Sequence, residues 1–240
     1  MNRTLFCHMM MTLDGKITGN HSQFSETKKG GELYYEYGFT DEAPHPVDAW
    51  ISGRSTAQKH FTDGNEPELT TDHEAVPDGD FIVDTDFDHY YVVLDGHGRV
   101  DWPKDTIEYN EFKAKVVVVV TEETSDDYKA FLRDKNIPYV IAGQSEIGLN
   151  DALERLQQNF PMESFMVGGG AKLNWSFIKA GLCDELSLVV SPILEGDPDA
   201  IPFALPNRDN DSTDPVPLEL ISNDTIADST IYLRYKVKND

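Results

Sequence analysis

The sequence predicts an α/β protein with a mostly parallel sheet flanked by helices. Apolar runs of strand length alternate along the chain with segments of helical periodicity. Residues 114–121 include five consecutive valines, a composition typical of a strand that is covered on both faces. Residues 165–196 read as a strand, a glycine turn, a helix and a second strand in direct succession. Alternation of this kind places ligands at the carboxyl ends of the strands.

In chain order, strand-length apolar runs bounded by polar residues predict the following strands: 4–11, 47–52, 90–95, 114–121, 139–142, 186–193, 218–222 and 230–237. Residues 81–84 are compatible with a short edge strand. Apolar stripes and capping residues predict a short helix after Gly53 and helices at 25–37, 125–135, 149–159 and 171–180, with Ser25 as a cap. Apolar and polar residues alternate in the last strand, which predicts an antiparallel, half-exposed strand and a possible dimer edge. No repeat or linker divides the chain, so residues 1–240 predict a single domain.

Composition restricts the function classes. The net charge of −23 argues against nucleic acid or an anionic membrane as a partner, because both require clustered Lys and Arg. No apolar run approaches the ~20 residues of a membrane span. The N-terminus lacks the features of a signal peptide, and Cys7 and Cys183 fall in strand-like segments, where we expect buried thiols. We therefore expect a cytoplasmic protein.

Residues 60–98 contain no Lys or Arg, and ten Asp and Glu residues lie between Asp63 and Asp88. The simplest interpretation is an acidic loop that is exposed to solvent. A divalent-metal site is the alternative, but the carboxylates lack the spacing of a calcium loop, so we predict no metal ligand.

Three glycines, Gly168 to Gly170, follow an apolar run and precede the helix predicted from Ala171. A glycine turn that opens a helix presents unpaired N–H groups and the positive end of the helix dipole, which together can hold a phosphate group. The turn matches neither the P-loop nor the G-x-G-x-x-G fingerprint, since Leu173 follows Lys172. A tight turn required only for packing is the alternative.

Several segments together match one family: residues 12–16 (TLDGK), 48–56, 67–70 (PELT), 93–95, 168–173 and 181–186 (GLCDEL). With these motifs in this order, the chain resembles the reductase domain of bacterial riboflavin biosynthesis, the C-terminal domain of the bifunctional deaminase-reductase. The resemblance implies a dihydrofolate-reductase-like, three-layer α/β/α fold. The zinc deaminase signature is absent from the sequence, so we expect only the reductase half.

The resemblance implies an NADPH-dependent reductase similar to 5-amino-6-(5-phosphoribosylamino)uracil reductase, which transfers hydride to a ribosylamino-pyrimidine or a related substrate. The implied cofactor-binding residues are Thr56, Asp95, Gly96, Gly169, Gly170, Ala171 and Lys172. From their places at strand ends we also expect Thr121 and Arg54 to contact a ligand, and the planar guanidinium of Arg54 suits either the 2′-phosphate of the cofactor or the phosphate of the substrate. The implied substrate-binding residues are Met11, Ser22, Leu69 and Gly168, and the implied catalytic residues are Asp14 and Lys16. We expect a homodimer that binds a small-molecule substrate.

The sequence departs from the family at four positions. Gly168 replaces a glutamate and Asp72 an arginine, both of which contact substrate in the family, while His8 replaces a lysine and Pro44 an arginine. These losses permit an alternative function, a nucleotide-binding paralogue with a different substrate or no turnover. At the level of single residues, Asp14 can simply hold a turn, Lys16 can face solvent, and His8 can be a hydrogen-bonded core residue.

Overall fold

The computed structural model describes residues 3–207, 212–227 and 229–239. It divides into two units, which are described in turn: the first unit comprises residues 1–3 and 48–163, and the second comprises residues 4–47 and 164–240. The single domain expected over residues 1–240 stays a prediction.

In the first unit, strands β2 (Ala49–Gly53), β3 (Tyr90–Leu94) and β5 (Phe112–Val120) pair in parallel, in that order. The short strand β6 (Tyr139–Ile141) runs parallel to the end of β5, and β4 (Thr106–Tyr109) is antiparallel to its beginning. All five valines of β5 are completely buried, as expected for a doubly covered strand.

Three helices follow strands of the first unit: α2 (Arg54–Phe61), α3 (Asp126–Asp134) and α4 (Leu149–Asn159). Ser125 caps α3 by accepting a hydrogen bond from the N–H of Tyr128, and two aspartates in the first turn complement the helix dipole. In α4 the buried side chains Leu153 and Leu156 confirm the predicted apolar stripe.

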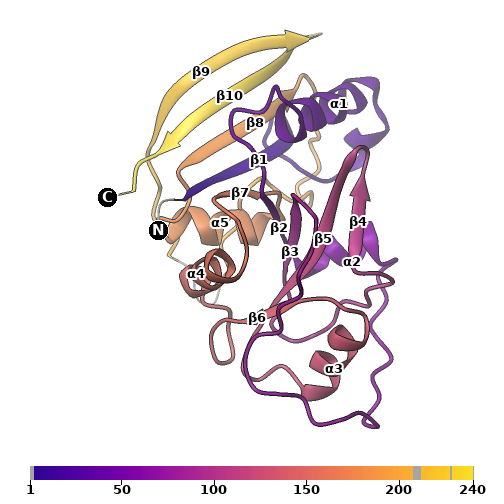
Figure 1. Ribbon diagram of the computed structural model, residues 1–240. Coiled ribbons are helices and arrows are strands. Elements are labelled where there is room, and N and C mark those ends of the chain that lie inside the picture. Colours follow the sequence, from indigo (N-terminus) through magenta and orange to yellow (C-terminus); the bar gives the residue numbers. More distant parts are fainter. Residues whose placement is uncertain (1–2, 208–211, 228, 240) are drawn as a thin grey trace. The chain divides into compact units, whose positions relative to one another are not determined.

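In the second unit, β1 (Thr4–Thr12) lies between β7 (Ser164–Val167) and β8 (Glu185–Ser191), and both neighbours are parallel to it. Strand β10 (Thr230–Val237) is antiparallel to β8, and β9 (Leu218–Ala227) is antiparallel to β10, so the two form a long hairpin (Figure 1). The predicted antiparallel C-terminal strand is confirmed.

Helix α1 (Ser25–Phe39) lies against one face of β1, and the glycine turn that opens α5 (Ala171–Lys179) lies against the other. The imidazole of His8 stacks on Tyr34 of α1, with ring centroids 4.6 Å apart. The next residue, Met9, approaches Gly169, which comes just before α5. Successive side chains of a strand point to opposite faces, so α1 and the glycine turn lie on opposite sides of β1. This layering confirms the predicted α/β class with a mostly parallel sheet.

Several boundaries differ from the sequence prediction. Residues 81–84 do not form a strand, because only Phe81 makes an isolated bridge, to Tyr139. Phe24, not Ser25, is the N-cap of α1. Strand β4 was not predicted, because four residues that include a glutamate give a weak strand pattern. Strand β9 continues five residues beyond its predicted end. That polar extension is stabilised by pairing with β10, which is an interaction that local propensity does not contain.

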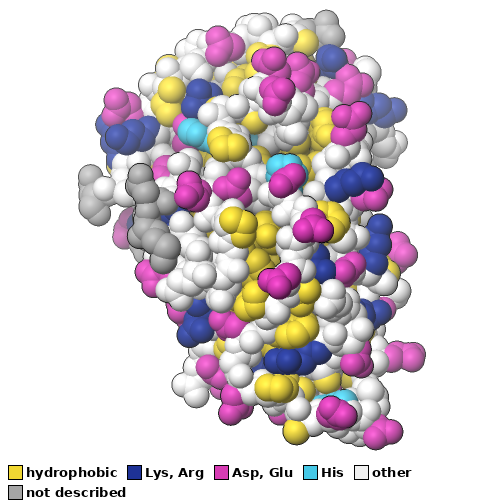
Figure 2. Space-filling model, viewed as in Figure 1, with side chains coloured by type: hydrophobic (Ala, Val, Ile, Leu, Met, Phe, Trp, Pro, Cys, Tyr) yellow, Lys and Arg dark blue, Asp and Glu magenta, His cyan; other side chains and the backbone are white. Residues whose placement is uncertain are grey.

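The last strand is also not at the edge of the sheet. It lies between β8 and β9, and β9 forms the edge. On the surface, acidic side chains are distributed over the whole face seen in Figure 2, in keeping with the net charge of −23. Within the described residues, no helix has both the length and the apolar character needed to cross a membrane.

Candidate functional site

The loop after β1 is held by the carboxylate of Asp14. Its Oδ1 accepts hydrogen bonds from Thr12 Oγ1 at 2.6 Å and from the backbone N–H of Glu195 at 3.0 Å, and its Oδ2 accepts one from Gly196 N–H at 3.1 Å. These donors, with the Thr12 hydroxyl contributing most, hold the pKa of Asp14 well below its usual range. A carboxylate that is ionised and engaged in this way fits the turn-holding role that the sequence also allowed. Its catalytic role stays a prediction.

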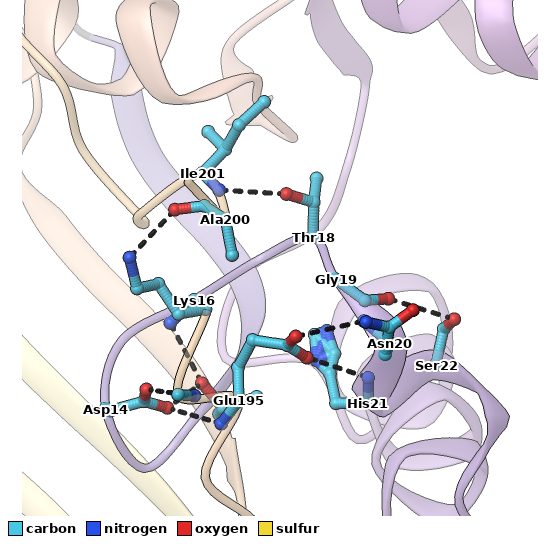
Figure 3. Close-up of polar contacts among 12 residues, drawn as sticks. Asp14, Lys16, Thr18, Gly19, Asn20, His21, Ser22, Glu195, Ala200 and Ile201 are labelled. Carbon is cyan, nitrogen blue, oxygen red and sulfur yellow. Dashed lines mark hydrogen bonds and ion pairs between the residues drawn. The ribbon is translucent and has the colours of Figure 1, made fainter. Parts of the chain in front are cut away.

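Lys16 extends toward the segment that follows β8 (Figure 3). Its Nζ donates to the carbonyl oxygen of Ala200 at 2.8 Å, and the neighbouring residues pair with Ile201: the N–H of Ile17 donates to Ile201 O, and the N–H of Ile201 donates to Thr18 Oγ1. The side chain of Lys16 is therefore half-buried and hydrogen-bonded within the protein.

The same loop encloses a buried glutamate that the sequence analysis did not identify. The side chain of Glu195 is 2% exposed, and its oxygens accept hydrogen bonds from the N–H of Asn20 at 3.1 Å and of His21 at 2.7 Å. His21 Nδ1 lies 3.7 Å from Glu195 Oε2. A single glutamate in a loop rich in Pro, Gly and Asp carries no signal in the sequence, because its partners are backbone groups 174 and 175 residues away.

Gly19 makes this arrangement possible. Its φ is +137°, and a Cβ at this position would lie 2.2 Å from the carboxyl carbon of Glu195. The short 3₁₀ helix η1 (Asn20–Gln23) follows at once and contains the predicted substrate residue Ser22, whose exposed hydroxyl donates to Gly19 O at 3.3 Å.

The glycine turn between β7 and α5 packs closely against Met9 of β1. Gly169 has a φ of +92°, and a Cβ there would lie 3.1 Å from the Cε of Met9; the peptide bond that joins it to Gly170 is cis. The first bond of α5 runs from Asn174 N–H to Gly170 O. The N–H groups of residues 171–173 therefore have no intrahelical acceptor, and no side chain caps the helix.

Asn174 connects this turn to the loop of Asp14. Its side chain is completely buried; Nδ2 donates to Phe203 O at 2.7 Å, and the N–H of Phe203 donates to Gly15 O at 2.8 Å. The Oδ1 of Asn174 is buried without a hydrogen-bond partner and lies 4.0 Å from where a Cβ of Gly169 would be.

The other predicted residues of the second unit fall around the same two segments. Met11 is half-buried and shares a face of β1 with Met9, and Gly168 is half-buried at the end of β7. Lys172 is exposed, and its Nζ lies 3.4 Å from Asn207 Oδ1. The structure thus brings the TLDGK loop and the glycine turn together through the segment 200–205.

In the first unit, Asp95 organises the turn after β3. It is 1% exposed, and Oδ2 accepts hydrogen bonds from the N–H of Arg99 at 2.7 Å and of Val100 at 2.9 Å, and from the hydroxyl of Tyr128 at 3.1 Å. Burial and the adjacent Asp95 charge raise the pKa of Tyr128 well above its ordinary value. The second oxygen, Oδ1, is buried without a hydrogen-bond partner.

Two threonines join this turn to the end of β5. Thr121 Oγ1 and Thr124 Oγ1 each donate to the carbonyl oxygen of Gly96 at 2.8 Å. Gly96 and Thr121, both predicted to bind cofactor, therefore lie side by side.

Arg54 is linked to the same turn through Gln58. Its Nη1 donates to Gln58 Oε1 one helical turn later, and Gln58 Nε2 donates to Arg99 O at 2.8 Å. Thr56 is half-buried in the first turn of α2, and Leu69 is 40% exposed in the acidic segment. Among the described residues, no cluster of three or more His, Cys, Asp or Glu side chains has the arrangement of a metal site.

The layered sheet, with a glycine turn opening α5, defines a dihydrofolate-reductase-like α/β protein. The RibD C-terminal domain family matches residues 3–230, and the chain belongs to this family. The predicted resemblance is confirmed.

Two relatives carry the same name as each other. The 2,5-diamino-6-ribosylamino-4(3H)-pyrimidinone 5′-phosphate reductase of Methanothermobacter thermautotrophicus is 30% identical over 231 residues, which cover 95% of each chain. The reductase of the same name from Aquifex aeolicus is 24% identical over 94 residues, covering 39% of this chain and 42% of that one.

Solved structures share the fold. A pyrimidine reductase-like protein of Corynebacterium diphtheriae has a TM-score of 0.66 at 15% identity and covers 99% of this chain and 93% of its own. RibD of Acinetobacter baumannii has a TM-score of 0.62 at 18% identity; the match covers 99% of this chain but 58% of RibD. The riboflavin biosynthesis reductase of Saccharomyces cerevisiae has a TM-score of 0.59 at 13% identity, covering 99% of this chain and 90% of that one.

Proposed function

We propose that this protein is an NADPH-dependent reductase of riboflavin biosynthesis that reduces the ribose of a ribosylamino-pyrimidine 5′-phosphate to a ribityl group. The observation that carries the proposal is the 30% identity to a named pyrimidinone phosphate reductase over 95% of both chains.

The residues of the glycine turn fit the phosphate groups of a dinucleotide. The N–H groups of Ala171 and Lys172 are at the positive end of α5, and Gly169 brings the turn close to Met9 without a Cβ between them. NADPH supplies the hydride when bound, and the protein supplies binding and orientation. We propose that Gly169, Gly170, Ala171 and Lys172 hold its pyrophosphate.

Within the first unit, we propose Arg54, Thr56, Asp95, Gly96 and Thr121 as further cofactor contacts. Arg54 suits the 2′-phosphate, because its planar guanidinium binds phosphate through paired donors. The unpartnered Oδ1 of Asp95 can accept a hydrogen bond from a hydroxyl or amide group.

For the substrate we propose Met11, Ser22 and Gly168 of the second unit and Leu69 of the first as contacts, with Lys16 as a cation and Asp14 fixing the loop. Gly168 lacks the carboxylate, and Asp72 lacks the guanidinium, that the resemblance implies at these positions. The relative's name specifies the 2,5-diamino-pyrimidinone, whereas the reductase that the sequence resembles acts on the uracil.

A titration followed by turnover tests the proposal. NADPH binding is measured by fluorescence or calorimetry, and the absorbance of NADPH is then followed after addition of the diamino-pyrimidinone or of the uracil compound. Oxidation with either compound supports the reductase and identifies the preferred base. Binding without oxidation favours the paralogue that lacks turnover, and absence of NADPH binding contradicts the proposal.

We also propose a homodimer that uses the edge strand β9. Leu218, Leu220 and Ile221 are 39%, 48% and 48% exposed on this strand, and an exposed apolar edge is suited to pairing with a second copy. Sedimentation velocity of the protein and of Leu220→Glu tests this: the substitution should shift a dimer toward the monomer, and a wild-type monomer contradicts the proposal.

A further inference from the structure

Two segments of the second unit are joined by reciprocal hydrogen bonds, in which a carboxylate of each segment binds backbone N–H groups of the other. Asp14, in the loop after β1, accepts hydrogen bonds from the N–H groups of Glu195 and Gly196. Glu195 in turn accepts hydrogen bonds from the N–H groups of Asn20 and His21, at the other end of the same loop (Figure 3). We call this pair of reciprocal contacts the Asp14–Glu195 clasp.

In the Glu195 half of the clasp, the N–H groups of Asn20 and His21 form an anion-binding site, which the protein's own carboxylate occupies. The side chain is 2% exposed, and burying a carboxylate is unfavourable unless donors compensate it. Here the compensation comes from two backbone N–H groups at the start of η1, and charge-assisted bonds of this kind are among the stronger ones in proteins. The backbone of Asn20 and His21 is thereby fixed in direction.

The space for the carboxylate is created by Gly19, where a Cβ would lie 2.2 Å from the carboxyl carbon and 2.4 Å from Oε2 of Glu195. With glycine at position 19, the backbone lies closer to the carboxylate than it could with any other residue type. The glycine and the glutamate are therefore parts of one arrangement.

The loop held by the clasp contains three predicted site residues, Asp14, Lys16 and Ser22. Ser22 is in η1, one residue after His21, and its exposed hydroxyl is placed by the same short helix. We propose that Glu195 is a positioning residue for substrate: it touches no ligand itself, and it sets the place of the 19–23 backbone from which Ser22 contacts the substrate. The positioning role rests on the proposed reductase function.

The test is Glu195→Gln, with Glu42→Gln as the matched control because Glu42 is exposed in the same unit. The amide keeps the size of the side chain but replaces one acceptor with a donor that faces a backbone N–H. We expect KM for the pyrimidine phosphate to rise at least about tenfold, as loss of a charge-assisted bond implies. NADPH affinity should stay within about twofold, because none of the hydrogen bonds of the clasp involves the glycine turn.

Two further variants guard against a simple folding defect. Glu195→Asp retains the charge and should recover part of the lost substrate affinity, whereas Gly19→Ala should reproduce the Glu195→Gln effect from the opposite side of the contact. Unfolding curves of each variant show whether the fold is intact.

Hydrogen exchange separates this proposal from the proposed function, because it requires no substrate. Exchange in a peptide covering residues 15–23 should accelerate in Glu195→Gln and remain at the wild-type rate in Glu42→Gln. Unchanged exchange overturns the proposal, and so does faster exchange with an unchanged KM. If wild-type protein does not reduce the pyrimidine phosphates, the proposed function fails, and exchange alone then decides whether Glu195 fixes the loop.

Discussion

His8 Nδ1 lies 2.7 Å from Ser187 Oγ between the paired strands β1 and β8, and His8 Nε2 lies 2.9 Å from the carbonyl oxygen of Tyr34. A carbonyl oxygen only accepts, so the hydrogen is on Nε2, and Nδ1 accepts from the Ser187 hydroxyl. Ser187 Oγ also lies 2.7 Å from the hydroxyl of Tyr232. The sequence allowed a hydrogen-bonded core role for His8, and its complete burial in this network fits that role.

The first prediction concerns pH and stability. Burial lowers the pKa of His8 from 6.5 to about 4, so the folded state binds the proton more weakly than the unfolded state. The free energy of unfolding should therefore fall as pH decreases from 6.5 to about 4, by up to about 3 kcal/mol from this residue. Denaturant unfolding of wild type and His8→Gln across this range measures the contribution. Parallel pH dependences in the two proteins would contradict it.

Gly169→Ala should weaken NADPH binding and destabilise the protein. An alanine at a φ of +92° is strained by about 1–2 kcal/mol, and its Cβ would press on Met9 at 3.1 Å. Relief of this contact would shift the turn and with it the N–H groups of Ala171 and Lys172, which we propose hold the cofactor phosphate.

Gly31→Ala is the matched control, since no atom lies within 4 Å of its Cβ position in α1. This substitution should leave NADPH affinity unchanged and should not destabilise the helix. Equal cofactor affinity in the two variants, measured by calorimetry, would argue against a phosphate at the glycine turn.

Asp95→Asn should destabilise the first unit by about 2 kcal/mol. The substitution removes the charge that accepts hydrogen bonds from the N–H groups of Arg99 and Val100 and from the Tyr128 hydroxyl. Urea unfolding measures the loss. Asp86→Asn, in which the side chain is exposed, should remain within about 0.5 kcal/mol of wild type. Similar values for both variants would show that the Asp95 contacts contribute little.

Arg54→Gln should reduce the preference for NADPH over NADH. If the guanidinium binds the 2′-phosphate, its loss removes a charge-assisted contact that only NADPH makes, so we expect the ratio of the two affinities to fall about tenfold. Lys104→Gln makes the same change of charge at an exposed position and should preserve the ratio. A ratio that Arg54→Gln leaves unaltered would place the 2′-phosphate elsewhere.

Parts of the site could be predicted because their signals are local. Residues 12–16 and the glycines from Gly168 to Gly170 stand at strand ends, and the structure places both turns there, joined through Phe203 and Asn174. Gly96 and Thr121 were predicted from separate strands and are hydrogen-bonded. Glu195 could not be found in this way, because its carboxylate binds backbone donors that are distant in the chain.

The sequence alone determined the alternation of strands and helices, the buried valine strand, the glycine turn and the family, since each of these depends on residues that are neighbours along the chain. The tertiary structure decided the length of β9, its position outside β10, and the contacts of Asp14, Asp95 and Glu195. The physical reason is that a carboxylate's partners and a strand's register are set by groups far apart in sequence, which come together only when the sheet and its loops have formed.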